Sequence, residues 1–368
     1  MKNLTYILDI GSSKISLLAC LVSKGKSIII TSVNQEYDGF MDGEFFSTKQ
    51  VQEVVHNLVK LIRERTHKKI TNIYIGVPSE FSACVCKRVT RQMVPARRIT
   101  EQELIELFDG INETSLNEDY EVINFSPLQY ELDGIATNKL SSQRISKFNM
   151  DCSYILVTKR FYNFLTEICN QVHIEEVNFV STALAQAQFA RQNIIDSLQP
   201  IVLVDVGHIT TSVAVSKGEG LLMLSSFSLG GGHITADLMQ VNNLSYNEAQ
   251  QIKHKVCLTV QSKKDEKYLA YYNHQPIKTL INITNDVVKA RIENIANVVK
   301  KVLQTSSKFE NLPVYLTGDG VCNFRGVINV FEAVLNTQVG ILKSNLQNGA
   351  DKYQTSKIAL ASIIEDLV

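Results

Sequence analysis

Two short turns in this chain combine an aspartate with a glycine and with hydroxyl side chains. Residues 9–14 read DIGSSK, and residues 205–211 read DVGHITT. Glycine allows a tight turn in which successive backbone N–H groups converge on phosphate oxygens. Hydroxyls and a lysine ammonium add further donors, so both turns predict contacts with a polyphosphate. The residues expected to make them are Asp9, Gly11, Ser12, Ser13, Lys14, Asp205, Gly207, Thr210 and Thr211.

The two aspartates and a later glycine turn extend this predicted site. Asp9 and Asp205 each end an apolar strand beside the expected phosphates. Mg²⁺ is a hard cation that keeps several waters and accepts carboxylate partners, so these aspartates are expected to hold it through water. Residues 317–320 read TGDG after a strand. Gly318, Asp319 and Gly320 would let the backbone approach a base and ribose.

Three features of the same motifs leave alternatives open. His208 and Ile209 supply bulk where glycine would suit a phosphate, so hydrolysis is expected to be slow or absent. His208 could be a catalytic base, but a partly exposed hairpin histidine is the favoured interpretation. Gly231 and Gly232 precede an expected helix. Backbone contact to a nucleotide and a flexible helix start are equally good interpretations of this pair.

The elements that must position these residues form an internal repeat. The segments ILDIGSSKISLLACLV and LVDVGHITTSVAVS superimpose as strand, turn and strand, with Asp9 over Asp205 and Gly11 over Gly207. Apolar residues at helical spacing predict helices over about 160–172, 181–193, 233–241, 245–254, 278–303 and 352–367, and one starting near 47. Three expected helix starts carry capping-box pairs, at 47–50, 100–103 and 245–248.

Composition limits the classes of function. The 368 residues have room for two domains, each with a core. Lys+Arg and Asp+Glu number 37 each, so no positive field for nucleic acid is expected. Seven scattered cysteines, including Cys84 and Cys86, lack the second pair that a zinc site needs and fit a reducing cytosol. No signal peptide or membrane span is evident, so we expect a cytoplasmic protein.

The motifs resemble those of the actin/Hsp70/sugar-kinase ATPase superfamily and, within it, the bacterial cell-division family FtsA. DIGSSK is similar to the first phosphate motif, and DVGHITT to the second without its middle glycines. LTGDG at 316–320 is similar to the adenosine motif, and GGGHITAD at 230–237 resembles an FtsA segment. The resemblance covers nearly the whole chain. It implies an α/β, actin-like (ribonuclease H-like) two-lobe ATPase fold with a small α+β insert of the 1C type in the first lobe.

The resemblance also implies a division of the chain into subdomains. Residues 1–81 and 162–198 would form the core of lobe 1 (1A), interrupted by the 1C-like insert at 82–161. Residues 199–230 and 309–350 would form the core of lobe 2 (2A), interrupted by subdomain 2B at 231–308. Residues 351–368 would return to lobe 1 as a C-terminal helix.

The function implied by the resemblance is that of a scaffold. FtsA-like proteins bind ATP with Mg²⁺, form filaments beneath the membrane and link FtsZ to later division proteins, which bind the 1C subdomain. The C-terminal tail of FtsZ would bind subdomain 2B, where Lys278, Lys289 and Arg291 could receive its acidic residues. A solvated basic face is the alternative interpretation of these three residues.

The end of the sequence differs from that of typical FtsA proteins, and two other functions are compatible with the same motifs. The last expected helix has few cationic residues and the chain stops at Val368, which argues against membrane attachment in cis. Peripheral contact at the inner face of the membrane stays open. One rival is a nucleotide-poor scaffold like the type IV pilus protein PilM. Another is a phosphotransferase or hydrolase, for which the motifs offer no positioned base beyond Asp9 and Asp205. No catalytic residue is therefore assigned.

Overall fold

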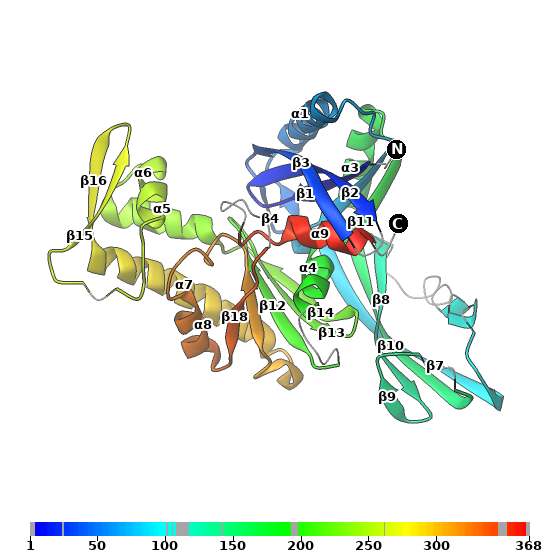
Figure 1. Cartoon of the computed structure of the whole chain (residues 1–368). Coiled ribbons are helices and arrows are strands. Elements are labelled where there is room, and N and C mark those ends of the chain that lie inside the picture. Colours follow the sequence, from blue (N-terminus) through cyan, green and yellow to red (C-terminus); the bar gives the residue numbers. More distant parts are fainter. Residues whose placement is uncertain are drawn as a thin grey trace.

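The computed structural model of the chain has two lobes, each built on a five-stranded sheet (Figure 1). It describes residues 4–23, 26–100, 102–104, 106–107, 118–140, 143–192, 198–260, 262–344 and 352–365. The lobe 1 sheet runs, in spatial order, β3 (Lys26–Glu36), β2 (Lys14–Ser23), β1 (Leu4–Ile10), β6 (Asn72–Val77) and β11 (Glu176–Ser181). The lobe 2 sheet runs β14 (Gly220–Phe227), β13 (Thr211–Lys217), β12 (Ile201–Val206), β17 (Val314–Thr317) and β18 (Val339–Ile341).

The two sheets share one topology. In each, the first three strands pair antiparallel and the last two join in parallel. The repeat read from the two hairpins is therefore part of a longer duplication that includes the neighbouring parallel strands. A small hairpin of β4 (Phe40–Met41) and β5 (Glu44–Phe45) follows β3.

Helices cover the sheets close to where periodicity predicts them. They are α1 (Thr48–Thr66), α3 (Lys159–Gln171), α4 (Thr182–Arg191), α5 (Gly231–Asn242), α6 (Tyr246–Lys253), α7 (Ile281–Leu303), α8 (Val327–Leu335) and α9 (Ser356–Glu365). Short 3₁₀ turns lie between β6 and β7 (η1, Ser79–Phe81) and between α7 and β17 (η2, Ser307–Phe309). In the described part of the chain, no helix has the length and apolar character needed to span a membrane.

One helix prediction is wrong at its start. The helix expected over 278–303 begins at Ile281, and Lys278 belongs instead to β16 (Gln275–Leu280), which pairs with β15 (Lys267–Tyr272). Asn273 and His274 connect the two strands with positive φ angles of 46° and 62°. Such a two-residue turn matches the twist of a hairpin. The hairpin and the helix follow one another without a linker, so their patterns merge in the sequence.

The capping predictions have a mixed outcome. Two boxes are complete, and in the one at Ser245 the Glu248 carboxylate accepts the Ser245 N–H at 2.8 Å. The box at Thr100 has both reciprocal bonds with Glu103. At α1 the Ser47 hydroxyl accepts the Gln50 N–H, but the Gln50 side chain turns to the N–H of Asp38. That box is therefore half formed.

Helices α4 and α9 lie between the two sheets and join the lobes (Figure 1). They share one apolar core with both sheets. Its members include Ile7 and Leu18 of lobe 1, Leu203 and Ala214 of lobe 2, and Leu184 and Leu360 of the helices. The lobes are thus connected by packed side chains as well as by the chain itself.

The segment expected as an insert forms its own four-stranded sheet, ordered β7 (Ser82–Arg97), β10 (Ile145–Thr158), β8 (Tyr120–Leu132) and β9 (Ile135–Thr137). Figure 1 shows this sheet extending away from lobe 1. It also contacts lobe 2. The Glu219 N–H donates to Pro127 O at 3.0 Å, and the Leu221 N–H donates to Ser153 Oγ at 3.2 Å. A segment that leaves and re-enters lobe 1 therefore packs on the β13–β14 turn of lobe 2.

Candidate functional site

The two predicted phosphate turns have the same backbone geometry. The Gly11 N–H donates to Lys14 O at 3.0 Å, and the Gly207 N–H donates to Thr210 O at 2.9 Å. The strand registers also agree, because Asp9 pairs with Ser16 and Asp205 with Ser212. The two hairpins are thus related residue by residue across the lobes. They also touch, since the Ile209 N–H donates to Ser12 Oγ at 3.0 Å.

A cleft of about 230 Å³ lies where the hairpins face each other. Its lining brings together, from the predicted set, Asp9, Gly11, Ser12, Ser13, Lys14, Asp205, Gly207, Gly318 and Asp319. It shares Ser13, Glu36, His208 and Asp319 with a larger cavity of about 670 Å³, which Gly320 and Lys253 also line. The structure therefore joins the hairpins and the glycine turn in one continuous polar space.

The two aspartates face this space with different partners. Asp9 Oδ2 accepts the Ser356 hydroxyl at 2.8 Å, and Asp205 Oδ2 accepts the Gln186 amide at 2.7 Å. Burial, together with the charges of Asp319 and Asp9 and against the Gln186 bond, raises the pKa of Asp205 to about 6. Carboxylates that repel one another favour a bound cation.

The donor set fits a cation held through water. Among the described residues, no group of three or more His, Cys, Asp or Glu side chains is placed to hold a metal ion directly. Two carboxylates on one cleft suit hydrated Mg²⁺, which keeps most of its waters. Asp9 and Asp205 are the residues that would hold it.

A chain of side chains links the first hairpin to the glycine turn. Lys14 Nζ donates to Gln354 Oε1 at 3.3 Å, and the Gln354 amide donates to Asp319. Gln186, Gln354 and Ser356 were missed by sequence reasoning. They are single polar residues in or beside helices, and none belongs to a recognisable motif. Only Gln186 could have been suspected, because α4 is rich in alanine and glutamine.

Several predicted residues support the second hairpin from behind. The Gly231 N–H donates to Gly207 O at 2.9 Å and the Gly232 N–H to His208 O at 2.7 Å. A Cβ added at Gly231 would lie 2.5 Å from the Cα of Gly320, and one added at Gly320 would lie 2.3 Å from Gly207 O, which explains why both are glycines. Thr211 is fully buried, and its hydroxyl donates to Leu229 O at 2.6 Å. Thr210 lines a small cavity of about 90 Å³ that adjoins the cleft.

His208, Ile209 and Lys253 form the wall of the larger cavity. Burial, followed by the nearby Lys253 charge, lowers the pKa of His208, which favours a neutral imidazole. Lys253 Nζ donates to Gly231 O at 2.6 Å, and burial lowers its pKa to about 8. Lys253 was not predicted to line the site, because a lysine in a polar helix such as α6 is expected to be exposed to solvent.

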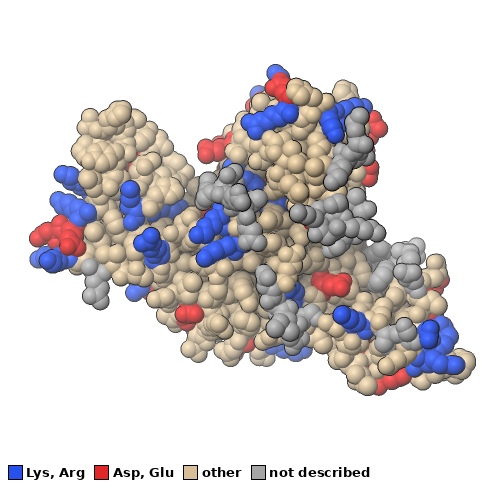
Figure 2. Space-filling view, viewed as in Figure 1, with Lys and Arg blue, Asp and Glu red and all other residues tan. Residues whose placement is uncertain are grey.

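The three basic residues proposed for partner binding do not form one patch. Lys278 lies on β16, and Lys289 is exposed on α7 with Glu293 at 3.8 Å. Arg291 makes two bonds to Asp237, at 2.7 and 2.9 Å. Positions two apart on a helix point about 200° apart, so Lys289 and Arg291 face different directions. Figure 2 shows basic and acidic side chains scattered over the visible face, with a basic group at the far end of the insert.

Comparison with known proteins gives matches in sequence and in fold. The family model described as cell division protein FtsA matches residues 202–363. The cell division protein FtsA of Enterococcus faecalis is 20% identical over 92% of this chain and 78% of its own. That of Enterococcus hirae is 20% identical over 98% of this chain and 83% of its own.

Two solved structures share the fold at low identity. The PilM–PilN type IV pilus biogenesis complex superimposes with a TM-score of 0.62 and 12% identity over 99% of both chains. MreB5 of Spiroplasma citri bound to AMPPNP gives 0.58 and 12% over 100% of this chain and 97% of its own. These neighbours confirm the predicted two-lobe actin-like fold. The chain is therefore similar in sequence to FtsA proteins and has an actin-like fold.

Proposed function

We propose that this chain binds ATP with Mg²⁺ between its lobes and acts as an FtsA-like scaffold of cell division. The observation that carries the proposal is the pair of matching hairpins, each with its Gly N–H bond, facing one cleft with Asp9 and Asp205. Converging N–H groups and the Lys14 ammonium suit phosphate oxygens. The FtsA relatives, named as cell division proteins, and AMPPNP in the MreB5 structure support this assignment.

The two joined cavities suit the two parts of a nucleotide. The phosphates would occupy the cleft of about 230 Å³ between the hairpins. The nucleoside would occupy the larger cavity, beside Asp319, Gly320, Gln250 and Lys253. Bound ATP touches both lobes, so it would favour one closed arrangement in which subunits assemble into filaments.

We place the proposed partners on the two outer subdomains. The FtsZ tail would bind 2B, where a groove of about 390 Å³ lies beside Arg291 and Asp237. An acidic peptide in this groove would compete with Asp237 for Arg291. Later division proteins would bind the insert. The proposed site of action is the inner face of the membrane at the division site.

The test compares Asp9→Ala and Lys14→Ala with Lys49→Ala, whose side chain is 86% exposed. Calorimetry should show at least about tenfold weaker Mg–ATP binding in the first two variants, because each removes a charge-assisted contact. Sedimentation with ATP should show filament loss in parallel. Unchanged affinity in both variants would sink the proposed site.

A nucleotide-poor scaffold like PilM is the second candidate, favoured by the TM-score of 0.62 over 99% of both chains. In that case the cleft would hold the lobes together without ATP. Mg–ATP would then leave the melting temperature of the purified protein unchanged, whereas a binding site raises it by mass action.

A further inference from the structure

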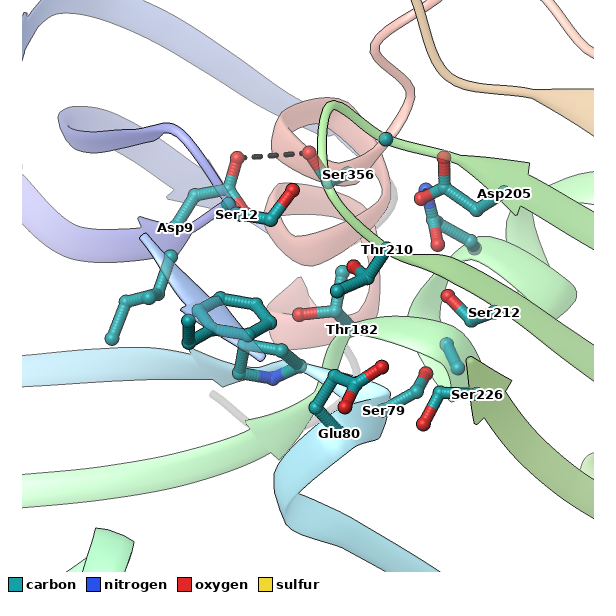
Figure 3. Close-up of a pocket in the computed structure, with 17 residues that line it drawn as sticks. Asp9, Ser12, Ser79, Glu80, Thr182, Asp205, Thr210, Ser212, Ser226 and Ser356 are labelled. Atoms are coloured by element: carbon teal, nitrogen blue, oxygen red, sulfur yellow. Dashed lines mark hydrogen bonds between the residues drawn. The ribbon is translucent and has the colours of Figure 1, made fainter. Parts of the chain in front are cut away.

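A small cavity lies against both phosphate hairpins and adjoins the cleft (Figure 3). Its volume is about 90 Å³, room for several ordered waters. It shares Asp9, Gly11, Ser12 and Gly207 with the cleft, whereas Lys14 and Asp319 line the cleft alone. The two hollows also share Gln186, Asp205 and Ser356, so the cavity adjoins the proposed phosphate site.

Glu80 points into the cavity from η1 (Figure 3). The neighbouring Phe81 fixes this turn, because its ring packs against Phe40 at 5.1 Å and Phe161 at 4.6 Å between centroids. Ser226 of lobe 2 and the backbone N–H groups of Gly43 and Asp42 hydrogen-bond the Glu80 carboxylate. The carboxylate is thus positioned by an aromatic cluster on one lobe and a hydroxyl on the other.

Two polar atoms at this cavity lack partners within the described part of the chain. They are Glu80 Oε1 and Thr182 Oγ1, and both are buried. Buried polar atoms are almost always satisfied by protein, water or ligand, because leaving them unpaired is costly. Both residues line the cavity. The cavity therefore suits a polar guest held between Glu80 and Thr182.

We propose that Glu80 is the general base for hydrolysis of the terminal phosphate of a nucleoside triphosphate; the inference rests on the proposed ATP site. A water in the cavity attacks the γ-phosphorus, and Glu80 takes its proton. The bond from that phosphorus to the β–γ bridging oxygen breaks, and the electron pair leaves with the diphosphate. The products are a nucleoside diphosphate and inorganic phosphate. An in-line displacement needs the attacking water and the leaving diphosphate on opposite sides of the γ-phosphorus, and a water in the adjoining cavity can approach from the side of Glu80.

The electrostatic surroundings suit this role. Burial raises the pKa of Glu80, the hydrogen bonds from Ser226, Gly43 and Asp42 partly offset that rise, and the Asp42 charge adds to it. Asp9 and Asp205 are the other carboxylates that line the cavity. A carboxylate with a raised pKa is a stronger base than an ordinary one at neutral pH.

The experiment measures phosphate release in a single turnover, with protein in excess over Mg–ATP. Glu80→Gln keeps the shape of the side chain and should slow release by about 10²-fold or more without weakening ATP binding. Glu64→Gln, an exposed glutamate on α1, is the matched control and should behave as wild type. The rate of phosphate release by the wild type should rise with pH through the pKa of Glu80. The Glu80→Gln variant should lack this rise, which is the acid limb of the pH–rate profile.

Any result that differs from these expectations contradicts the proposed role of Glu80. Wild-type rates in Glu80→Gln, or loss of its ATP binding, would exclude the general-base role. ATP binding without hydrolysis by the wild type would overturn this inference and leave the proposed function standing, whereas absence of ATP binding would overturn both. If Glu80→Gln does not fold, Ser226→Ala replaces it. Loss of that hydroxyl should move the acid limb to higher pH, and an unmoved limb would contradict the role of Glu80.

Discussion

At the scale of single residues, the second hairpin copies the backbone of the first but not its side chains. The Ile209 N–H, which a phosphate could use, already donates to Ser12 Oγ. The Ile209 side chain also reaches lobe 1, because a Cβ added at Gly39 would lie 2.8 Å from its Cδ1. A phosphate must therefore compete with Ser12 for that donor. This competition gives a physical reason to expect that the second hairpin binds phosphate less tightly than the first.

Lys253 provides a prediction about pH. Its pKa falls from 10.5 to about 8 in the folded protein. Between these values the unfolded chain binds more protons, so the free energy of unfolding should rise with pH from about 8 to 10.5. The rise should be about 1–3 kcal/mol, since each pKa unit corresponds to about 1.4 kcal/mol. Urea denaturation of wild type and Lys253→Met at several pH values measures it.

The control for this prediction is Lys49→Met, because the Lys49 side chain is 86% exposed. Its urea curves should keep the wild-type dependence on pH. Lys253→Met should lose the rise, whatever its stability at pH 7. Parallel curves for wild type and Lys253→Met would show that Lys253 titrates normally in the folded protein.

Residues were predictable where the backbone restricts the choice of side chain. Gly11, Gly207 and Gly318 mark turns that other residues do not enter easily, so they appear as motifs. Gln186 and Glu80 act alone, through side chains that tertiary packing brings to the site. No local pattern distinguishes such residues from ordinary polar positions, and neither was found from the sequence.

At the scale of elements, periodicity located most helices and the paired hairpins. It failed at β15 and β16, where a hairpin leads directly into α7. The alternation of buried Ala270 and Ile277 with exposed neighbours is short, and only the Asn273–His274 turn could have revealed it. The full duplication was also hidden, since parallel strands such as β6 and β17 pair across long sequence separations.

The glycine turn after β17 provides a prediction at this scale. Gly318 has φ +90°, and an added Cβ would lie 2.2 Å from Val206 O and 2.5 Å from Asp205 Oδ1. Gly318→Ala should lower the free energy of unfolding by about 2–4 kcal/mol, because backbone strain adds to a clash with backbone. Mg–ATP binding should weaken too, since Asp205 must move. Chemical denaturation and calorimetry measure the two effects.

Gly134 is a matched control for that change. Its φ is +88°, but nothing lies within 4 Å of an added Cβ. Gly134→Ala should therefore cost only the strain of the left-handed backbone, about 1–2 kcal/mol, and leave ATP binding unchanged. Equal losses in both variants would mean that the space beside Asp205 is not restricted.

At the scale of the whole molecule, the lobes are connected by more than the cleft. The insert packs on the β13–β14 turn, where Gly218 has φ +58° and an added Cβ would lie 2.2 Å from Leu128 O. The Ser228 hydroxyl donates to Asp42 across the lobes at 2.9 Å. None of these contacts follows from local sequence, because each depends on how complete lobes are placed. Because of these contacts, we expect that moving the lobes apart at the cleft would also disturb the packing of the insert on the β13–β14 turn.

Arg191 tests this coupling where α4 passes from lobe 1 to lobe 2. It is 9% exposed, and its guanidinium donates to Ser216 Oγ at 2.8 Å, to Gln199 O at 2.8 Å and to Ser216 O. Arg191→Lys keeps the charge but cannot reproduce this fork, which leaves buried acceptors unpaired. The free energy of unfolding should fall by about 2–4 kcal/mol.

Calorimetry should show the consequence for the two lobes. The wild type should unfold in one transition because its lobes share a core around α4 and α9. Arg191→Lys should separate the lobe 2 transition toward lower temperature, since α4 is then held less firmly to β13. Arg65→Lys is the control, because Arg65 is exposed and donates to Ser32 O, so stability should stay within about 0.5 kcal/mol. A single unshifted transition in Arg191→Lys would show that the shared core alone holds the lobes together.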